Sequence, residues 1–295
     1  MVEELREPFL ERLAGRAGAL GGSLCVGLDP ALDALPHHLG TDALAVRRFC
    51  LELIEATAPY ACAFKPNSAY FEALGASGWE VLREVVAVAR TRALVLLDAK
   101  RGDVGHTAEA YASAVFDQIG ADACTVNPYL GYDALEPFLR RRGRMTFVLC
   151  RTSNPGAGDF QDLRLAATGD PLYLEVARRA RAWADMDNEP RVGLVTGATW
   201  PKELTQIRAA APGLPLLIPG VGAQGGDLAL AVEAARGVDR SGPYLLSISR
   251  GITGASREPN FAEAAATAAA GYLARLQTLT QAATPLQGAP AASTL

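Results

Sequence analysis

Eight short apolar runs divide the chain, and a polar turn and then a helical stretch follow each of them. The runs cover residues 23–28, 61–64, 93–97, 123–126, 145–150, 192–196, 214–218 and 244–248. Strands that are apolar along their whole length are typical of a parallel sheet buried on both faces. Eight consecutive strand–helix units in roughly 250 residues predict a single-domain α/β fold, the (β/α)8 or TIM barrel. A doubly wound open sheet is the alternative, which periodicity alone does not exclude.

Polar residues at the ends of these runs favour the barrel over the open sheet. They lie at or just past the carboxyl ends of the predicted strands: Asp29, Lys65, Asp98, Lys100, Asn127, Ser153, Pro219 and Arg250. In a barrel these ends converge on one mouth, where active sites are built, whereas an open sheet would spread them along an edge. The pattern therefore predicts one site at the carboxyl mouth.

The remaining segments give the predicted domain organisation. We predict an N-terminal helical segment over 1–22, a catalytic barrel over 23–280 and a disordered tail over 281–295, where the composition is poor in core residues. The loop 151–170 is long and rich in Gly, Asp and Pro, which is typical of an active-site lid. Further helices are expected over 42–58 (capped by Thr41 or Asp42), 77–92, 107–119, 132–142 and 171–186, from Pro201, from Asp227 and over 260–280.

Composition argues against several classes of protein. The net charge is −4, which gives no support for binding to nucleic acid or to a bilayer surface. No apolar run reaches the roughly 18 residues of a membrane span, and the charged N-terminus does not resemble a signal peptide. The five cysteines are an odd number, mostly within apolar runs, which predicts reduced thiols in a cytoplasmic protein. The three histidines lack metal-ligand spacing, so no metal site is expected.

The stretch 93–107 carries the strongest chemical signal. Asp98 and Lys100 are two residues apart, so on a strand they share a face, and Asp103 follows closely. A strand end stabilised by ion pairs, with no chemistry, is the alternative interpretation. Asp29 and Lys65 would extend these residues into a set of alternating charges. A lysine among carboxylates keeps its proton, which favours Lys100 as a proton donor and argues against a Schiff-base aldolase.

A glycine-rich stretch, 220–225, follows the seventh predicted strand and matches G-x-G-x-x-G. A dinucleotide site is a weak interpretation, because that fingerprint belongs at the first turn of a βαβ unit. Barrel phosphate sites favour the loops after strands seven and eight, so backbone N–H groups here and Arg250 are predicted to hold a phosphate. A plain glycine turn is the alternative.

Four motifs in this order resemble those of orotidine 5′-phosphate decarboxylases, and in particular the longer bacterial branch (type 2) of that family. The motifs are DAKRGDVG (98–105), FKPNSAYFE (64–72), RTSNPGA (151–157) and PGVGAQGG (219–226). The first contains the D-x-K-x-x-D signature, and the resemblance covers roughly residues 20–275.

The resemblance implies a decarboxylation of orotidine 5′-phosphate to uridine 5′-phosphate without metal or cofactor, in pyrimidine biosynthesis. Lys100 is then the acid that protonates C6, and Asp98 and the partner's Asp103 hold it charged. Lys65 is the fourth catalytic residue that the resemblance implies, and it completes the chain of charges. The resemblance also implies a homodimer in which Asp103 and Thr107 reach the neighbouring site. The expected substrate-binding residues are Asp29, Lys65, Asn127, Thr107, Ser153, Pro219, Gly222, Gln224, Ser249 and Arg250.

Two other functions stay open on the sequence alone. One is a different phosphosugar decarboxylase or aldolase on the same barrel, using Mg²⁺ or a Schiff base. The other is a non-catalytic barrel that binds a phosphorylated ligand. Intact Asp98 and Lys100 argue against the second, because binding alone does not need a proton donor.

Overall fold

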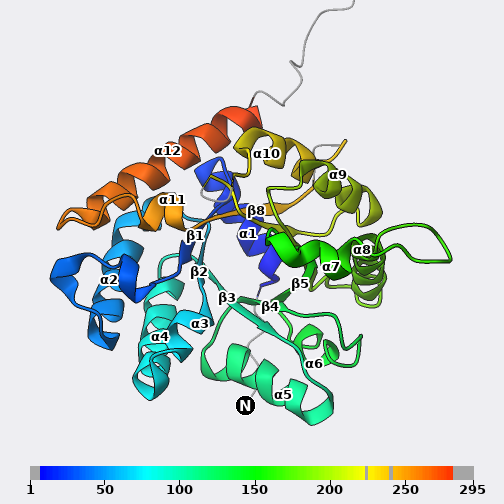
Figure 1. Cartoon of the computed structure of the whole chain (residues 1–295), viewed down its shortest axis with the longest axis horizontal. Coiled ribbons are helices and arrows are strands. Elements are labelled where there is room, and N and C mark those ends of the chain that lie inside the picture. The colour runs from blue at the N-terminus through cyan, green and yellow to red at the C-terminus, as the bar shows by residue number, and fades with distance from the viewer. Residues whose placement is uncertain (1–6, 223–224, 239–241, 282–295) are drawn as a thin grey trace, which may run out of the picture.

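Eight parallel strands form a closed barrel in the computed structural model, which describes residues 7–222, 225–238 and 242–281. They follow chain order, and β1 pairs with both β2 and β8, so the barrel prediction is confirmed and the open sheet is wrong. The strands are β1 Leu24–Leu28, β2 Ala63–Pro66, β3 Leu94–Arg101, β4 Ala123–Val126, β5 Met145–Arg151, β6 Val192–Thr196, β7 Leu216–Pro219 and β8 Tyr244–Ile248. Figure 1 shows the helices as a ring outside them.

The helices agree with the expected ones in order but not always in length. The described helices are α1 Phe9–Leu20, α2 Ala43–Thr57, α3 Ser68–Glu72, α4 Gly75–Arg90, α5 Gly105–Ser113, α6 Glu136–Leu139, α7 Gly158–Gln161, α8 Leu172–Ala184, α9 Pro201–Ala210, α10 Leu228–Arg236, α11 Arg250–Thr253 and α12 Phe261–Gln281. Asp42 caps α2 by accepting a hydrogen bond from the Ala45 N–H. The helix expected over 132–142 is only α6, and α3, α7 and α11 were not predicted, because each is a short helix within a loop.

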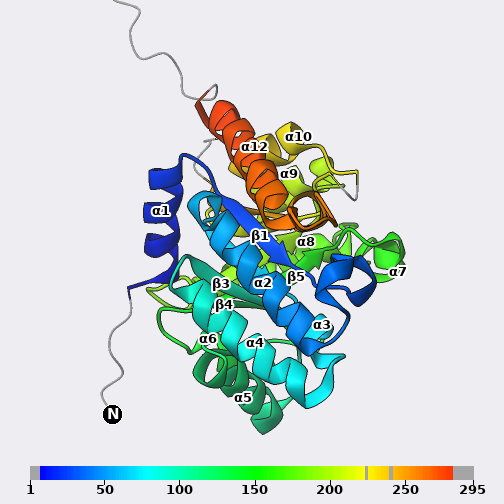
Figure 2. The same cartoon turned by 90° about the vertical axis from the view of Figure 1, so that its left-hand side faces the viewer.

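The helix α1 closes the amino-terminal end of the barrel. Phe9 and Leu13 are buried in the cluster that fills the barrel interior, and the Phe9 ring packs edge-on against Phe147 with centroids 6.2 Å apart. In Figure 2, α1 stands at the end of the barrel opposite α3 and α7. Burying a phenylalanine contributes about 1.5–3 kcal/mol, so α1 is a structural part of the barrel.

The buried thiols agree with the sequence-based expectation. All five cysteines are free and buried, as predicted. Burial raises the pKa of the Cys25 and Cys62 thiols to about 12, so both stay protonated at neutral pH. Among the described residues, no helix is both long and apolar enough to cross a membrane.

Candidate active site

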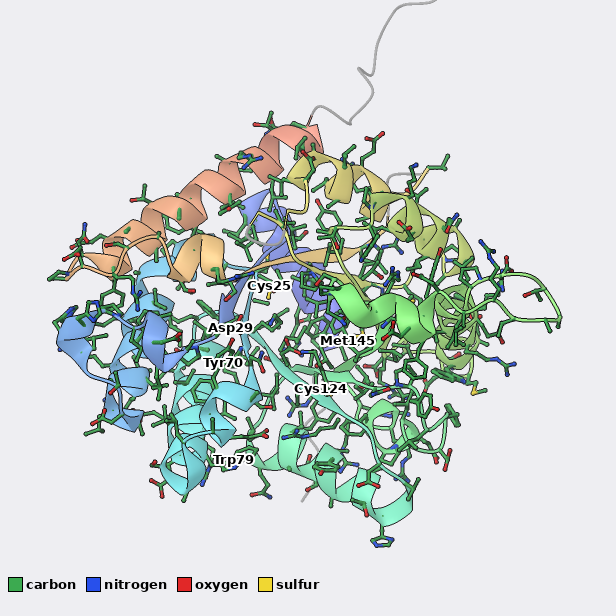
Figure 3. All side chains as sticks on the ribbon, in the orientation of Figure 1. Cys25, Asp29, Tyr70, Trp79, Cys124 and Met145 are labelled. Atoms are coloured by element: carbon green, nitrogen blue, oxygen red, sulfur yellow. The ribbon has the colours of Figure 1, made fainter. Side chains whose placement is uncertain are left out.

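A cavity of about 770 Å³ opens at the carboxyl ends of the strands. Eight residues of the predicted site line it: Asp29, Lys65, Asp98, Lys100, Ser153, Pro219, Ser249 and Arg250. Figure 3 labels two of the lining residues, Asp29 after β1 and Tyr70 on α3. The barrel therefore brings together, as expected, polar residues that lie more than 200 positions apart in the chain.

Asp98 is the centre of the charged residues in this cavity. One carboxylate oxygen, Oδ2, accepts a hydrogen bond from Lys65 Nζ at 2.9 Å. The other, Oδ1, accepts from Lys100 Nζ at 2.6 Å and from Thr125 Oγ1 at 2.9 Å. The carboxylate thus has three donors, two of them cationic, which fixes its position and favours its charged form.

The charge states of this cluster follow from its contacts. Burial alone would raise the pKa of Asp98, but the charges and hydrogen bonds of Lys65 and Lys100 outweigh burial and hold that pKa well below its usual range. Burial alone would lower the pKa of Lys65, but the Asp98 and Asp29 carboxylates outweigh it and raise that pKa above its usual range. Asp98 and Lys65 are therefore an ionised pair at neutral pH.

The two lysines differ in exposure. The side chain of Lys65 is 6% exposed, whereas that of Lys100 is 48% exposed. Lys65 is enclosed by its carboxylate partners, and Lys100 keeps an open approach from the cavity. A ligand can therefore reach the Lys100 ammonium much more easily than that of Lys65.

An irregularity in β3 places Lys100. Leu97 pairs with Cys124 and Arg101 with Val126, so β3 bulges between these two positions. Lys100 has a φ of +48°, a left-handed conformation that costs a residue other than glycine about 1–2 kcal/mol. Its backbone N–H donates to Thr125 Oγ1 at 3.0 Å, which helps to offset this cost.

Two polar atoms in the cavity wall have no hydrogen-bond partner among the described residues. Asp29 Oδ1 and Ser249 Oγ are both buried without a hydrogen bond. Gly27 lies against Ser249, since a Cβ on Gly27 would come within 2.7 Å of Ser249 Cβ. Buried polar atoms normally have partners, so this pair is suited to receive ligand groups such as hydroxyls.

The loop after β5 is held by a buried arginine. Arg151 Nη2 contacts Asp162 at 3.0 Å, and its guanidinium lies 4.2 Å from the Trp200 ring centroid. Trp200 Nε1 donates to the Thr152 carbonyl at 3.0 Å, and the Thr152 N–H donates to Gln161 Oε1 at 2.9 Å. These contacts fix Thr152, Ser153 and Asn154 on the cavity wall.

The glycine-rich loop after β7 was expected to offer backbone N–H groups to a phosphate, but three of its described glycines use theirs within the loop. The Gly222 and Gly226 N–H groups donate to carbonyls of the same loop, and so does the Gly225 N–H. Gly220 and Val221 line the cavity together with Pro219, but Gly222 does not. Gln224 lies outside the described residues. Arg250, at the start of α11, provides positive charge at this end of the cavity.

Besides Gly222, three predicted residues do not line this cavity. Asp103 Oδ1 accepts from the Val104 N–H at 2.8 Å, and Asn127 Oδ1 accepts from the Tyr129 N–H at 3.0 Å. Thr107 lies in the first turn of α5. Asn127 shapes the turn after β4.

Sequence reasoning missed Thr125, which contacts both Asp98 and Lys100. The available signal was a polar residue inside the apolar run 123–126, whereas the predicted residue of this strand was Asn127, just past its end. Tyr70, Thr152, Asn154 and Gln161 also line the cavity. They come from loops and short helices whose conformations the sequence did not reveal.

A closed barrel with a charged cavity at its carboxyl mouth defines a (β/α)8-barrel enzyme. A family model described as Orotidine 5'-phosphate decarboxylase / HUMPS family matches residues 22–266. The chain belongs to this family.

Similar proteins cover nearly the whole chain. An orotidine 5′-phosphate decarboxylase of Roseiflexus sp. (strain RS-1) is 51% identical over 261 residues, which are 88% of this chain and 94% of that protein. One from Herpetosiphon aurantiacus is 46% identical, over 92% of this chain and 98% of that protein. The solved structure of Leishmania donovani OMP decarboxylase is 40% identical, with a TM-score of 0.78, and the match covers 92% of this chain and 100% of that one.

Proposed function

We propose that the protein converts orotidine 5′-phosphate to uridine 5′-phosphate and CO₂, with Lys100 as the proton donor. The observation that carries this proposal is the hydrogen-bonded row Lys65–Asp98–Lys100 at the cavity, in which only Lys100 is open to a ligand. Family membership and the relatives named as decarboxylases support the same reaction.

The reaction breaks the bond between C6 and the substrate carboxylate, and CO₂ leaves. The electron pair stays on C6, where the Lys100 ammonium stabilises the developing charge and then gives its proton to that carbon. Water returns the proton to Lys100 after product formation. Asp98, ionised and in contact with Lys100, holds and aims the ammonium, and the partner's Asp103 is proposed to do the same. Electrostatic stabilisation of this kind is commonly the largest catalytic contribution.

The other cavity residues are proposed to bind the nucleotide. Asp29 and Ser249 present unpartnered buried oxygens that suit ribose hydroxyls, and Lys65 supports Asp29 electrostatically. Ser153 would contact the pyrimidine, and Arg250 with Pro219 the phosphate. Gln224 and Gly222 remain proposed phosphate contacts, and Asn127 a proposed substrate contact.

We also propose that the protein is a cytoplasmic homodimer in which each active site contains residues of both subunits. Large apolar side chains are exposed in the segments that follow β3 and β4: Val104 beside Asp103, Tyr111 on α5 one turn after Thr107, and Tyr129, Leu130 and Tyr132 in the loop after β4. An exposed group of this kind is typical of a protein–protein interface. A second copy that covers it would bring Asp103 and Thr107 towards the neighbouring cavity.

Thr125→Val should lower kcat about 10–100-fold, because it leaves the Lys100 N–H without its acceptor and removes a donor to Asp98. KM should change little, since Thr125 acts through these two residues. Thr125→Ser keeps the hydroxyl and should stay within about threefold of the wild-type protein. Steady-state kinetics of both variants test this role, and equal activity of Val and Ser variants would contradict it.

Arg250→Ala should lower kcat/KM for orotidine 5′-phosphate about 10–100-fold, the usual effect of losing a charged contact. The comparison substrate is orotidine, which lacks the phosphate. With orotidine the variant and the wild-type protein should react equally fast. An equal loss on both substrates would place Arg250 outside the phosphate site.

The ionised cluster should make stability depend on pH at both extremes. The lowered pKa of Asp98 stabilises the fold above about pH 4, and this contribution is lost as the pH falls. The raised pKa of Lys65 stabilises it below about pH 10, and this contribution is lost as the pH rises. Below pH 4, the free energy of unfolding should fall more steeply in the wild-type protein than in Asp98→Asn, by up to about 1.4 kcal/mol per pH unit. Urea unfolding measures both slopes, and identical slopes would contradict the account.

Two treatments distinguish the proposed reaction from Mg²⁺-dependent and Schiff-base chemistry. Activity in excess EDTA argues against a Mg²⁺-dependent relative. Borohydride added with substrate would trap a Schiff base on a lysine, and we expect no covalent adduct, because the lysines in the cavity are paired with carboxylates.

A further inference from the structure

A second cavity lies at the opposite end of the barrel, beside α1. It has a volume of about 330 Å³ and is lined by two residues of α1, Arg12 and Arg16, by the segment 90–94, and by Asp122. Four of the lining residues are arginines, Arg12, Arg16, Arg90 and Arg92. We name this cavity the arginine crevice. It shares no lining residue with the active-site cavity.

The charges of the arginine crevice do not cancel. Arg16 donates hydrogen bonds to two neutral carbonyls, those of Ala61 at 2.7 Å and Ala58 at 3.0 Å. Arg90 makes no ion pair with any described residue, and Arg12 is paired with Asp122 at 2.8 Å. Among the described residues, at least two positive charges, those of Arg16 and Arg90, therefore face this space without a carboxylate partner.

The remaining arginine is held only weakly. Arg92 contacts Glu55 at 2.8 Å, and both side chains are about half exposed. Exposed ion pairs of this kind contribute about 0–1 kcal/mol, so an incoming anion can compete for the Arg92 guanidinium. Arg12 and Arg16 are anchored to the barrel, which preorganises the inner side of the crevice.

We infer that the arginine crevice binds a small polyphosphate, a ligand with two or more phosphate groups. Guanidinium groups bind phosphate oxygens in pairs of parallel hydrogen bonds, and several arginines match several phosphates. Among the described residues that line the crevice there is no aromatic ring on which a nucleobase could stack. Inorganic pyrophosphate and sugar bisphosphates share the required chemistry, and a nucleotide would bind through its phosphates alone.

Isothermal titration calorimetry of the full chain with inorganic pyrophosphate tests this inference. Uridine 5′-phosphate at saturating concentration keeps the active site occupied. We expect one site per chain, with an affinity that falls at least about tenfold in Arg90→Gln and in Arg92→Gln. Because surface charges are screened by salt, raising the salt concentration should weaken binding further.

Two control variants locate the site. Arg83→Gln removes an exposed arginine from the same helix, α4, and should leave the affinity unchanged. Arg250→Ala removes the arginine of the other cavity and should also leave it unchanged. Binding that is lost in Arg250→Ala but kept in Arg90→Gln would place pyrophosphate at the active site and overturn the inference. A titration without binding would overturn it as well. Titrating a sugar bisphosphate and a nucleoside triphosphate into the wild-type protein and into Arg90→Gln then distinguishes the sources of the phosphate groups.

Discussion

Replacing Lys100 by alanine should lower kcat by at least about 10⁴-fold while product binding stays measurable. Proton donation by a positioned side chain contributes about 10²–10⁴-fold, and a charge aimed at the developing carbanion about 10²–10³-fold. Both contributions come from the same ammonium, which is the more open of the two lysine ammoniums in the cavity. Asp98 keeps its hydrogen bonds to Lys65 and Thr125 in this variant, so the cavity should keep its shape.

The control for this experiment is Lys202→Ala. The chain has three lysines, Lys65, Lys100 and Lys202, and Lys202 is exposed on α9 outside the cavity. We expect wild-type kinetics from it. Single-turnover kinetics measure the chemical step, and calorimetry with uridine 5′-phosphate measures binding. A Lys100→Ala protein that keeps kcat within about tenfold would remove Lys100 from the role of proton donor.

Mixing two inactive variants, Asp103→Ala and Lys100→Ala, should restore about a quarter of wild-type activity if the sites are shared. In a mixed dimer, the Asp103→Ala subunit has its own Lys100 and receives an intact Asp103 from its neighbour. That site is complete, and the other site lacks both groups. Random exchange makes half of the dimers mixed, and one of their two sites is active, which gives the quarter.

A matched pair makes the mixing experiment decisive. Asp98 and Lys100 contact each other within one cavity, so mixing Asp98→Ala with Lys100→Ala produces no complete site. That mixture should stay inactive under the same exchange conditions, and native mass spectrometry confirms the mixed dimers. Inactive mixtures of both pairs, with mixed dimers present, would contradict the proposal that Asp103 acts in the partner's cavity.

Apolar runs predicted the strands well because a parallel barrel buries both faces of each strand. The predicted bounds of β4, β6 and β8 agree with the observed ones, and the residues at the strand ends converge as a closed barrel requires. The charge pairing of Asp98 with Lys65 and Lys100 was also predicted from position alone. The surrounding carboxylates already favoured Lys100 as a proton donor, and the other roles in catalysis were inferred from the resemblance to a family.

Features that depend on local backbone conformation were not predictable from the pattern. The left-handed Lys100 and the bulge in β3 depend on a hydrogen bond to Thr125, a contact between strands. The N–H groups of Gly222, Gly225 and Gly226 donate within their own loop, although the glycine content suggested that they would be available to a phosphate. The packing of α1 in the barrel end requires the three-dimensional position of Phe9 and Leu13.

The most direct test of the account is a spectrophotometric assay with pure protein, orotidine 5′-phosphate and excess EDTA. We predict that the absorbance of orotidine 5′-phosphate disappears at the same rate with and without EDTA, with one uridine 5′-phosphate and one CO₂ formed for each substrate consumed. The Lys100→Ala protein should leave the absorbance unchanged. No reaction with the wild-type protein, or a reaction that stops in EDTA and returns with added Mg²⁺, would contradict the account.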